Sequence, residues 1–377
     1  MRFLPHIFLF LFAAFVFWPG ITTTDAIDRA EPRYTQVSKQ MLESGEYGNT
    51  YIRRFQRNEE PIGLHWAQIA GVKLSGANPN EVWGYRLASW LSMSLLIVVA
   101  FAFGQSILSG LAAKSRLAVE PRWQTRFDTE LAHIIPRAPA KAAGLLAALI
   151  LMVPWYAQAN AKLANPEALF MLCMALMFWS LWEVISAFEQ GRTKAPLRFV
   201  LTFWLAMAIS FLFKGPVAVV IVGLFIASYG FMTASWQWLA LLRLIPGATI
   251  LALITGPWVI WAWIASGGEY VLTAIGCQYL WCSVGEQAKH GNPPGFYLLE
   301  KPIFWIPIIF MLFPTIGWAF KNLRNKAVLF LICWILPSWI FYELYATKYP
   351  SYMLQFYLAF AFLVTGWLIG GDWLKPQ

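Results

Sequence analysis

The sequence predicts an all-α membrane protein with about ten transmembrane helices. Of its 377 residues, 59% are hydrophobic and only 12% are charged, whereas a soluble globular chain carries roughly 25% charged residues. Apolar stretches of about 20 residues, long enough to cross a bilayer, recur along the chain. The 21 Trp and 14 Tyr residues gather near the ends of these stretches, where amphipathic rings prefer the headgroup level.

The apolar stretches define the expected spans. They cover residues 4–22, 84–111, 142–159, 166–188, 196–213, 216–232, 244–266, 302–320, 327–345 and 351–371. We therefore expect a single transmembrane domain over residues 1–377. A cleavable signal peptide, with residues 7–18 as its apolar segment, is the alternative for the first stretch, but no convincing small-residue cleavage pattern follows it.

Lysine and arginine are unevenly distributed among the loops. If the N-terminus faces the cytoplasm, the cytoplasmic loops hold Lys114, Arg116, Arg122, Arg126, Arg137, Lys141, Arg192, Lys194, Arg198, Arg243, Lys321, Arg324 and Lys326. The opposite short loops hold few basic residues, so the bias predicts that both termini lie in the cytoplasm. We expect a multi-pass protein of a bacterial inner membrane. The net charge of +9 reflects this topology, and the dispersal of the basic residues disfavours a nucleic-acid partner.

Residues 23–82 form the first extracytoplasmic loop, in which we expect two amphipathic helices lying on the membrane. The first starts at Pro32 and stops at Gly45, and the second starts at Pro61 and stops near Gly76. Proline favours the first turn of a helix and glycine its end. Residues 112–141 instead place apolar and basic residues at helical spacing, which predicts a cytoplasmic basic segment that contacts anionic lipid.

The four cysteines are too few for a disulfide framework. Cys173 and Cys333 fall within spans, where a thiol packs as a small apolar group. Cys277 and Cys282 share an outside loop, where an oxidising compartment permits a bridge but a short loop often forbids its geometry. A disulfide between them stays open.

Polar motifs interrupt the apolar sequence on the extracytoplasmic side. Residues 160–167 form a turn that carries Lys162 and Glu167, and Lys214 stands in a Phe-Lys-Gly-Pro sequence at the opening of a span. Lys289 and His290 lie in a loop rich in glycine and proline. The last span opens on Thr-Lys-Tyr-Pro-Ser-Tyr at residues 347–352.

Taken in order, these motifs resemble those of a known family. Residues 28–34, 40–45 and 60–66 resemble the first extracytoplasmic loop of the GT-C membrane glycosyltransferases, most closely the bacterial aminoarabinose-transferase and protein-mannosyltransferase-like branch. The motifs at residues 213–216, 290–297 and 347–350 follow in the same order. The resemblance covers nearly the whole chain except residues 112–141, which look like an insertion. It implies a GT-C fold and transfer of a sugar from a polyprenyl-phosphate donor to an envelope acceptor, which is lipid A, another glycan or a protein.

The implied reaction needs a carboxylate to take the proton of the acceptor hydroxyl, and cations to hold the departing phosphate. By resemblance, the acids of the first loop supply the base, and Glu167 assists or binds a divalent ion. Asp28 and Glu31 are three residues apart, so on a helix they could share a proton or a divalent ion. The candidate catalytic residues, which are also the candidate metal ligands, are Asp28, Glu31 and Glu167. The candidate substrate-binding residues are Arg33, Tyr34, Arg57, Lys162, Lys214, Lys289, His290, Lys348 and Tyr352.

Several positions depart from the family pattern. Ala30 stands where an Asp is usual, Glu60 where a Lys is usual, Glu167 where an Asp is usual, and Ser351 where a His is often found. A noncatalytic relative that still binds polyprenyl-phosphate lipid is therefore one alternative. A transporter or flippase is another, which would place Glu183, Glu343 and Lys214 near the bilayer midplane.

Simpler structural interpretations exist for the same residues. Asp28 and Glu31 could merely stabilise a helix N-terminus, and Lys214 could extend its ammonium to the interface from a span end. Arg57 could contact lipid headgroups, and Lys289 and His290 could be solvated loop residues. For His65, packing on the face of its helix is favoured over a role as a ligand.

Overall fold

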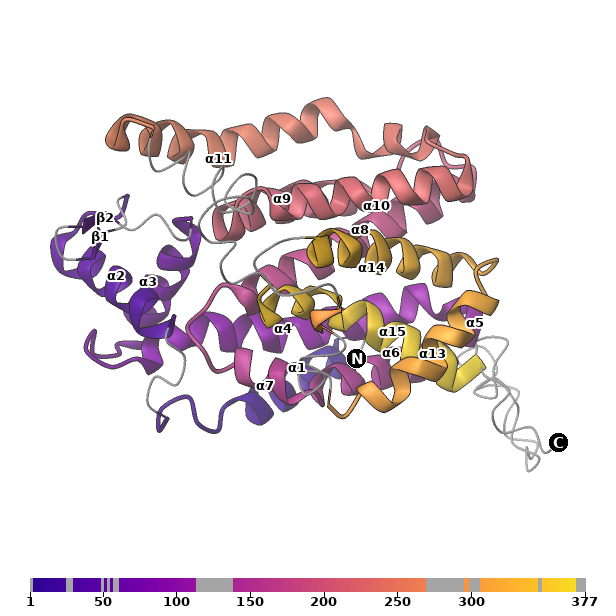
Figure 1. Cartoon of the computed structure of the whole chain (residues 1–377), viewed down its shortest axis with the longest axis horizontal. Coiled ribbons are helices and arrows are strands. Elements are labelled where there is room, and N and C mark those ends of the chain that lie inside the picture. The colour runs from indigo at the N-terminus through magenta and orange to yellow at the C-terminus, as the bar shows by residue number, and fades with distance from the viewer. Residues whose placement is uncertain are drawn as a thin grey trace.

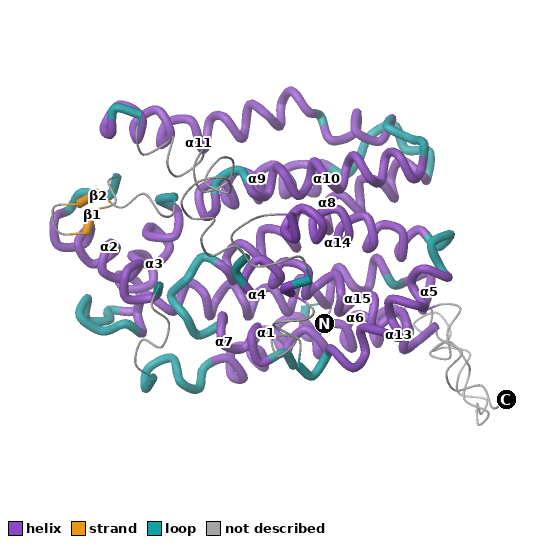
Figure 2. The backbone as a smooth tube through the Cα atoms, viewed as in Figure 1, coloured by secondary structure: helices purple, strands orange, loops and turns teal. Residues whose placement is uncertain are grey.

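The computed structural model describes residues 3–24, 30–48, 51–52, 55–56, 61–112, 138–268, 295–297, 306–344 and 348–370. Helices account for most of this part of the chain, and a two-residue strand pair, β1 (Tyr51–Ile52) and β2 (Phe55–Gln56), is the exception among the described residues. Figure 2 shows the strand pair at the edge of an otherwise helical molecule. The predicted all-α fold class is confirmed.

Six helical segments are long and apolar enough to cross a membrane: α4 (Trp83–Ile107), α8 (Glu167–Glu189), α9 (Leu197–Lys214), α11 (Leu244–Ser266), α14 (Lys326–Leu344) and Pro350–Gly370. The last consists of the 3₁₀ helix η8 (Pro350–Phe356) and α15 (Tyr357–Gly370). Four shorter apolar helices accompany them: α1 (Leu4–Phe17), α6 (Ala138–Met152), α10 (Val217–Thr233) and α13 (Ile309–Lys321). Each of the ten apolar stretches of the sequence overlaps one of these segments.

Helix α8 lies in the middle of the bundle and packs against α4 and α9. The Phe178 ring of α8 stacks on Trp334 of α14 at a centroid distance of 3.8 Å, and Phe225 of α10 meets Phe178 edge-on. Helices α4 and α6 approach closely because glycines face each other: a Cβ on Gly104 would lie 2.9 Å from the Cα of Gly144. Small residues commonly allow such close helix contacts in membranes.

Two further helices, α2 (Glu31–Ser44) and α3 (Gly63–Ser75), lie at one end of the bundle together with β1 and β2 (Figure 1). We call this the loop end. Both helices end at glycines with positive φ, Gly45 at 75° and Gly76 at 69°, as the sequence predicted. Apolar residues of α2, α3, α9 and α11 form a small core there: Val37, Met41, Ile62, Ile69, Leu212, Trp258 and Ala262.

The remaining short elements are α5 (Ser109–Ala112), α7 (Trp155–Asn160) and the 3₁₀ helix η3 (Gln237–Leu242). Helix α6 begins at Ala138, so the last four residues of the expected basic segment 112–141 belong to a bundle helix. Residues 113–137 lie outside the described residues. Cys173 and Cys333 are buried free thiols, as expected for cysteines within spans, whereas Cys277 and Cys282 lie outside the described residues.

Candidate active site

The turn between α7 and α8, residues 161–166, is the centre of the loop end. The Ala164 amide donates to Oε1 of Glu31 in α2 at 2.8 Å, and the Ala164 carbonyl accepts from the Gln68 amide of α3 at 2.9 Å. The Ser89 hydroxyl of α4 donates to the carbonyl of Asn165 at 3.1 Å. Three separate helices therefore fix this turn.

Asn165 prepares the start of α8. Its side-chain amide donates to the Asn160 Oδ1 at 2.8 Å, and its own Oδ1 accepts from the backbone amide of Glu167 at 3.2 Å. The Asn165 side chain thus satisfies a backbone donor that the helix start would otherwise leave without a partner. Glu167 is held in place as the first residue of α8.

A buried ion pair joins Glu31 to Arg86. The Arg86 Nε donates to Oε1 at 2.7 Å and Nη2 donates to Oε2 at 2.9 Å, while Nη1 donates to the carbonyls of Ile21 and Thr24 at 2.9 and 2.7 Å. The two side chains are 0% and 1% exposed, Glu31 being the fully buried one. Both oxygens of Glu31 are therefore engaged, which favours its role as an anchor of α2 over that of a proton acceptor.

Arg86 was not among the residues selected from the sequence, although a signal was present. It is the only charged residue in the 25 residues of α4. A lone charge inside an apolar stretch is costly in a membrane and normally has a buried partner. The sequence pattern alone did not identify Glu31 as that partner, because the two lie 55 residues apart.

A second buried ion pair joins Glu167 to Lys214. The Lys214 Nζ lies 2.6 Å from Oε1 and 2.7 Å from Oε2 of Glu167. Helix α9 ends at Lys214 because Gly215 adopts a positive φ of 57° and Pro216 follows. The ammonium also faces two aromatic rings, with its Nζ 5.5 Å from the Phe170 centroid and 5.9 Å from that of Tyr352.

Tyr352 belongs to an aromatic group at the start of the last span. Its ring stacks on Tyr342 at a centroid distance of 4.9 Å and meets Tyr349 edge-on at 5.6 Å. Lys348, at the beginning of the same segment, is buried. The structure thus brings Glu167, Lys214 and Tyr352 together, although they come from three separate spans.

The other candidate residues are distributed around this centre. Arg33 is exposed and Tyr34 is half-buried in the first turn of α2, and Lys162 is half-buried in the turn that precedes α8. Each lies at the loop end. Four candidates lie outside the described residues: Asp28, Arg57, Lys289 and His290.

The proposed divalent-ion site is not supported by the described residues. Within this part of the chain no three His, Cys, Asp or Glu side chains gather as a metal site would require. Glu31 and Glu167 each direct both oxygens to a basic side chain. A hard divalent cation needs several oxygen ligands, and these two carboxylates do not supply them in this arrangement.

His65 is packed inside the loop end, as expected. Its side chain is 2% exposed, and Nδ1 lies 2.9 Å from the Ser38 hydroxyl, which donates to Gln68 Oε1 at 2.5 Å. Because Gln68 donates onward to Ala164, this polar chain supports the turn that precedes Glu167. Burial lowers the pKa of His65 from 6.5 to about 4, against an opposing hydrogen bond with the Tyr34 backbone.

The lowered pKa of His65 predicts a pH-dependent stability. The folded protein keeps the imidazole neutral, whereas the unfolded chain takes up a proton below pH 6.5. The contribution of neutral His65 to the free energy of unfolding is therefore complete above pH 6.5. This contribution is lost as the pH falls toward about 4, by about 3 kcal/mol in total. We expect His65→Asn, which can keep one hydrogen bond but cannot titrate, to flatten the dependence of unfolding midpoint on pH in detergent. Identical pH profiles for both proteins would contradict this assignment.

Comparison with known proteins identifies the fold. No protein-family model matches the chain. The crystal structure of ArnT from Cupriavidus metallidurans bound to undecaprenyl phosphate is similar to this chain, with a TM-score of 0.72 at 16% identity. The match covers 97% of this chain and 60% of the ArnT chain. The apo structure of the same protein gives a TM-score of 0.71 at 19% identity. The chain has the GT-C fold.

Sequence comparison agrees with the structural match. Undecaprenyl phosphate-alpha-4-amino-4-deoxy-L-arabinose arabinosyl transferase 1 of Pseudomonas fluorescens is 25% identical over 342 residues, which are 90% of this chain and 55% of the relative. An arabinosyl transferase of the same kind from Pseudomonas aeruginosa is 25% identical over 335 residues, 89% of this chain and 54% of its own length. The resemblance to the aminoarabinose-transferase branch is confirmed, and the chain spans about half the length of these relatives.

Proposed function

We propose that the protein transfers a sugar from a polyprenyl-phosphate donor to an envelope acceptor at the loop end. The observation that carries this proposal is Lys214, a buried ammonium that faces Tyr352 at the end of a span. The GT-C fold is shared with a solved protein that binds undecaprenyl phosphate. We further propose that the loop end faces the extracytoplasmic side of a bacterial inner membrane and that both termini are cytoplasmic.

The proposed chemistry divides the charged residues into two groups. Lys214 and Lys348 hold the phosphate as its negative charge grows and the bond to the sugar breaks. Two of the three donors of the Lys214 ammonium reach Glu167, so a third remains for a phosphate oxygen. Arg33, Arg57, Lys289 and His290 stay candidates for further contacts with the donor, as do Tyr34 and Lys162.

Asp28 is the proposed base. It takes the proton of the acceptor hydroxyl as the hydroxyl oxygen attacks the sugar carbon. Glu31 then positions the first loop through Arg86. Glu167 is the second candidate for the base, and it can accept a proton only when the Lys214 ammonium turns from the carboxylate to the phosphate. By analogy with the relatives, the donor sugar is aminoarabinose and the acceptor is lipid A, a glycan or a protein.

A noncatalytic lipid-binding role is the second candidate, because Ala30 occupies the position where the family pattern expects an acid. Ala30 precedes α2 and contributes no side-chain hydrogen bond to its N-terminus.

A transport function is less favoured, because the two acids that it would use near the bilayer midplane have local hydrogen-bond partners. Glu183 accepts from the Ser106 hydroxyl at 2.6 Å, and Glu343 accepts from the Gly295 amide at 2.9 Å and lies at the end of α14.

A transfer assay with the purified chain tests the proposal. With undecaprenyl-phosphate aminoarabinose and lipid A, Asp28→Asn should lower turnover by about 10²-fold to 10⁴-fold and leave donor binding intact. Glu43→Gln is the matched control, because this exposed acid of α2 forms an ion pair with Lys39. Wild-type protein that binds undecaprenyl phosphate but transfers no sugar would favour the noncatalytic role. Full activity of Asp28→Asn would move the base to Glu167.

A further inference from the structure

A second group of polar side chains lies near the end of α8 that is remote from the loop end. Glu183 lies about 24 Å further along the axis of α8 than Glu167, at the usual rise of about 1.5 Å per residue. The hydrocarbon layer of a bilayer is about 30 Å thick. Because Glu167 begins α8 at the loop end, Glu183 falls inside the apolar layer, close to the opposite interface.

Four side chains of α4 and α8 form this group, which we call the Glu183 site: Ser106, Trp179, Trp182 and Glu183. The Ser106 hydroxyl donates to Oε1 of Glu183 at 2.6 Å, and the Trp179 indole donates to the same oxygen at 3.2 Å. The Trp182 indole donates to the Ser106 hydroxyl oxygen at 3.1 Å. Two helices therefore hold the carboxylate in one position.

The other carboxylate oxygen of Glu183 is open to a ligand. Glu183 has no ion-pair partner among the described residues, and the hydrogen bonds to its side chain within this part of the chain reach only Oε1. The side chain is half-buried, and Oε2 is not enclosed. A charged side chain inside the apolar layer normally pairs with an opposite charge. A cation at Oε2 would complete the site.

The position of the site restricts the cation. A divalent metal ion needs several oxygen ligands, whereas the Glu183 site offers one open carboxylate oxygen. The amine of the proposed sugar donor does not reach this oxygen, because the donor phosphate is held at Lys214, at the loop end. A dissolved amine would have to leave water for the apolar layer, at a large cost. The primary ammonium of a phospholipid headgroup is already at this interface, and its N–H donors can form a charge-assisted hydrogen bond with Oε2.

A basic side chain stands beside the site. Arg198, in the first turn of α9, is exposed, and its guanidinium carbon lies 4.8 Å from the centroid of the Phe199 ring. The Phe199 ring is in turn 5.6 Å from the ring of Trp179. An aromatic strip therefore joins the carboxylate to a basic surface that attracts lipid phosphate. This surface favours a headgroup that carries a phosphate as well as an ammonium.

We propose that the Glu183 site binds an aminophospholipid of the surrounding membrane, of the phosphatidylethanolamine class, with the primary ammonium of the headgroup on Oε2 of Glu183. Ser106 and Trp179 position the carboxylate for this contact. The site lies at the opposite interface from the proposed transfer site and takes a different lipid. The proposal is therefore independent of the proposed function, and a chain without transferase activity would still bind the lipid.

Lipid binding to the purified chain in nonionic detergent, measured by native mass spectrometry, tests the proposal. The probes are phosphatidylethanolamine, phosphatidylcholine and phosphatidylglycerol with the same acyl chains. Wild-type protein should bind phosphatidylethanolamine about 10-fold more tightly than phosphatidylcholine, whose quaternary ammonium has no N–H donor. Glu183→Gln should remove this preference, and Ser106→Ala should weaken phosphatidylethanolamine binding by about 5-fold. Glu189→Gln is the matched control and should change neither, because this acid of the same helix is paired with Lys326 at 2.9 Å.

Three results would overturn the aminophospholipid site. These are equal binding of phosphatidylethanolamine and phosphatidylcholine to wild-type protein, an unchanged preference in Glu183→Gln, or an equal loss of phosphatidylethanolamine binding in Glu189→Gln. The first comparison uses wild-type protein alone, so it stands even where a variant fails to fold. Water-soluble glycerophosphoethanolamine is a further probe. It should not displace the bound lipid at equal concentration, and displacement would show that the site takes a dissolved amine instead.

Discussion

Arg86→Met is expected to lower the free energy of unfolding by about 3–5 kcal/mol, the largest effect on stability of any single substitution that we predict. The variant removes the guanidinium that holds both oxygens of Glu31 and the carbonyls of Ile21 and Thr24. It leaves the Glu31 carboxylate buried and without its cation. Reversible unfolding in a titration of mixed micelles with an anionic detergent measures the loss.

Two control variants separate the ion pair from simple packing. Arg86→Lys retains a charge but not the two-pronged geometry, so it should fall between wild type and Arg86→Met. The double variant Glu31→Leu, Arg86→Met should recover part of the stability, because replacing both members of a buried pair costs less than removing one. A double variant less stable than Arg86→Met would show that the Glu31 contact to Ala164 is the more important one.

Lys214→Met is expected to weaken donor binding and to lower turnover by about 10²-fold to 10³-fold, as the loss of one preorganised charged donor does elsewhere. The physical reason is that the ammonium faces Tyr352 and still has one donor beyond the two that reach Glu167. Binding of undecaprenyl phosphate and the initial rate of transfer are the two measurements. Lys39→Met is the matched control, because this partly exposed lysine of α2 pairs with Glu43 at the loop end.

The alternative explanation is that Lys214 only neutralises Glu167. In that case the double variant Lys214→Met, Glu167→Leu should bind undecaprenyl phosphate as wild type does, since no uncompensated charge remains. If Lys214 contacts the phosphate, the double variant binds as poorly as Lys214→Met. Glu167→Leu completes the double-mutant cycle, because it retains the ammonium and removes the carboxylate.

The architecture followed from the sequence because apolar length and helix-ending residues are local signals. The proline and glycine at the ends of α2 predicted its limits, and the ten apolar stretches predicted the bundle segments. The ion pairs could not be predicted in the same way. Glu31 and Glu167 were selected as chemical groups, but their partners depend on which helices meet in space, and residues 55 and 47 positions apart cannot be paired from spacing alone.

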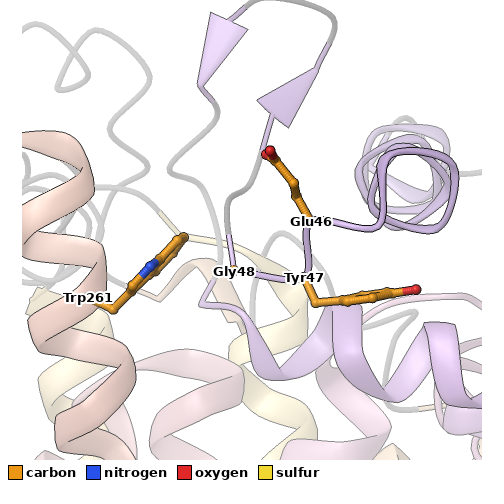
Figure 3. A pocket seen from close by; sticks show the side chains of 4 residues that line it. All are labelled: Glu46, Tyr47, Gly48 and Trp261. Carbon is orange, nitrogen blue, oxygen red and sulfur yellow. The ribbon is translucent and has the colours of Figure 1, made fainter.

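The close approach of Trp261 to Gly48 (Figure 3) illustrates the same limit. In the sequence Trp261 is one of many tryptophans near a span end, and Glu46 and Gly48 belong to no recognisable motif. Their association depends on the packing of α11 against α2 and α3 through Val37, Met41 and Ile69. An apolar contact between distant helices has no signature in a single sequence, because many leucine, valine and methionine residues could make it equally well.

The order of the partners along the chain matters for membrane insertion. Glu31 is synthesised before Arg86, so the carboxylate is already present when α4 enters the bilayer and its arginine can be neutralised on arrival. Glu167 likewise precedes its partner, because Lys214 follows it by 47 residues. At a synthesis rate of about 5–20 residues per second, the Glu167 carboxylate is made several seconds before α9 is complete. Glu31 is 55 residues ahead of Arg86, so the start of α2 is the part of the loop end whose charge the nascent chain leaves uncompensated for longest.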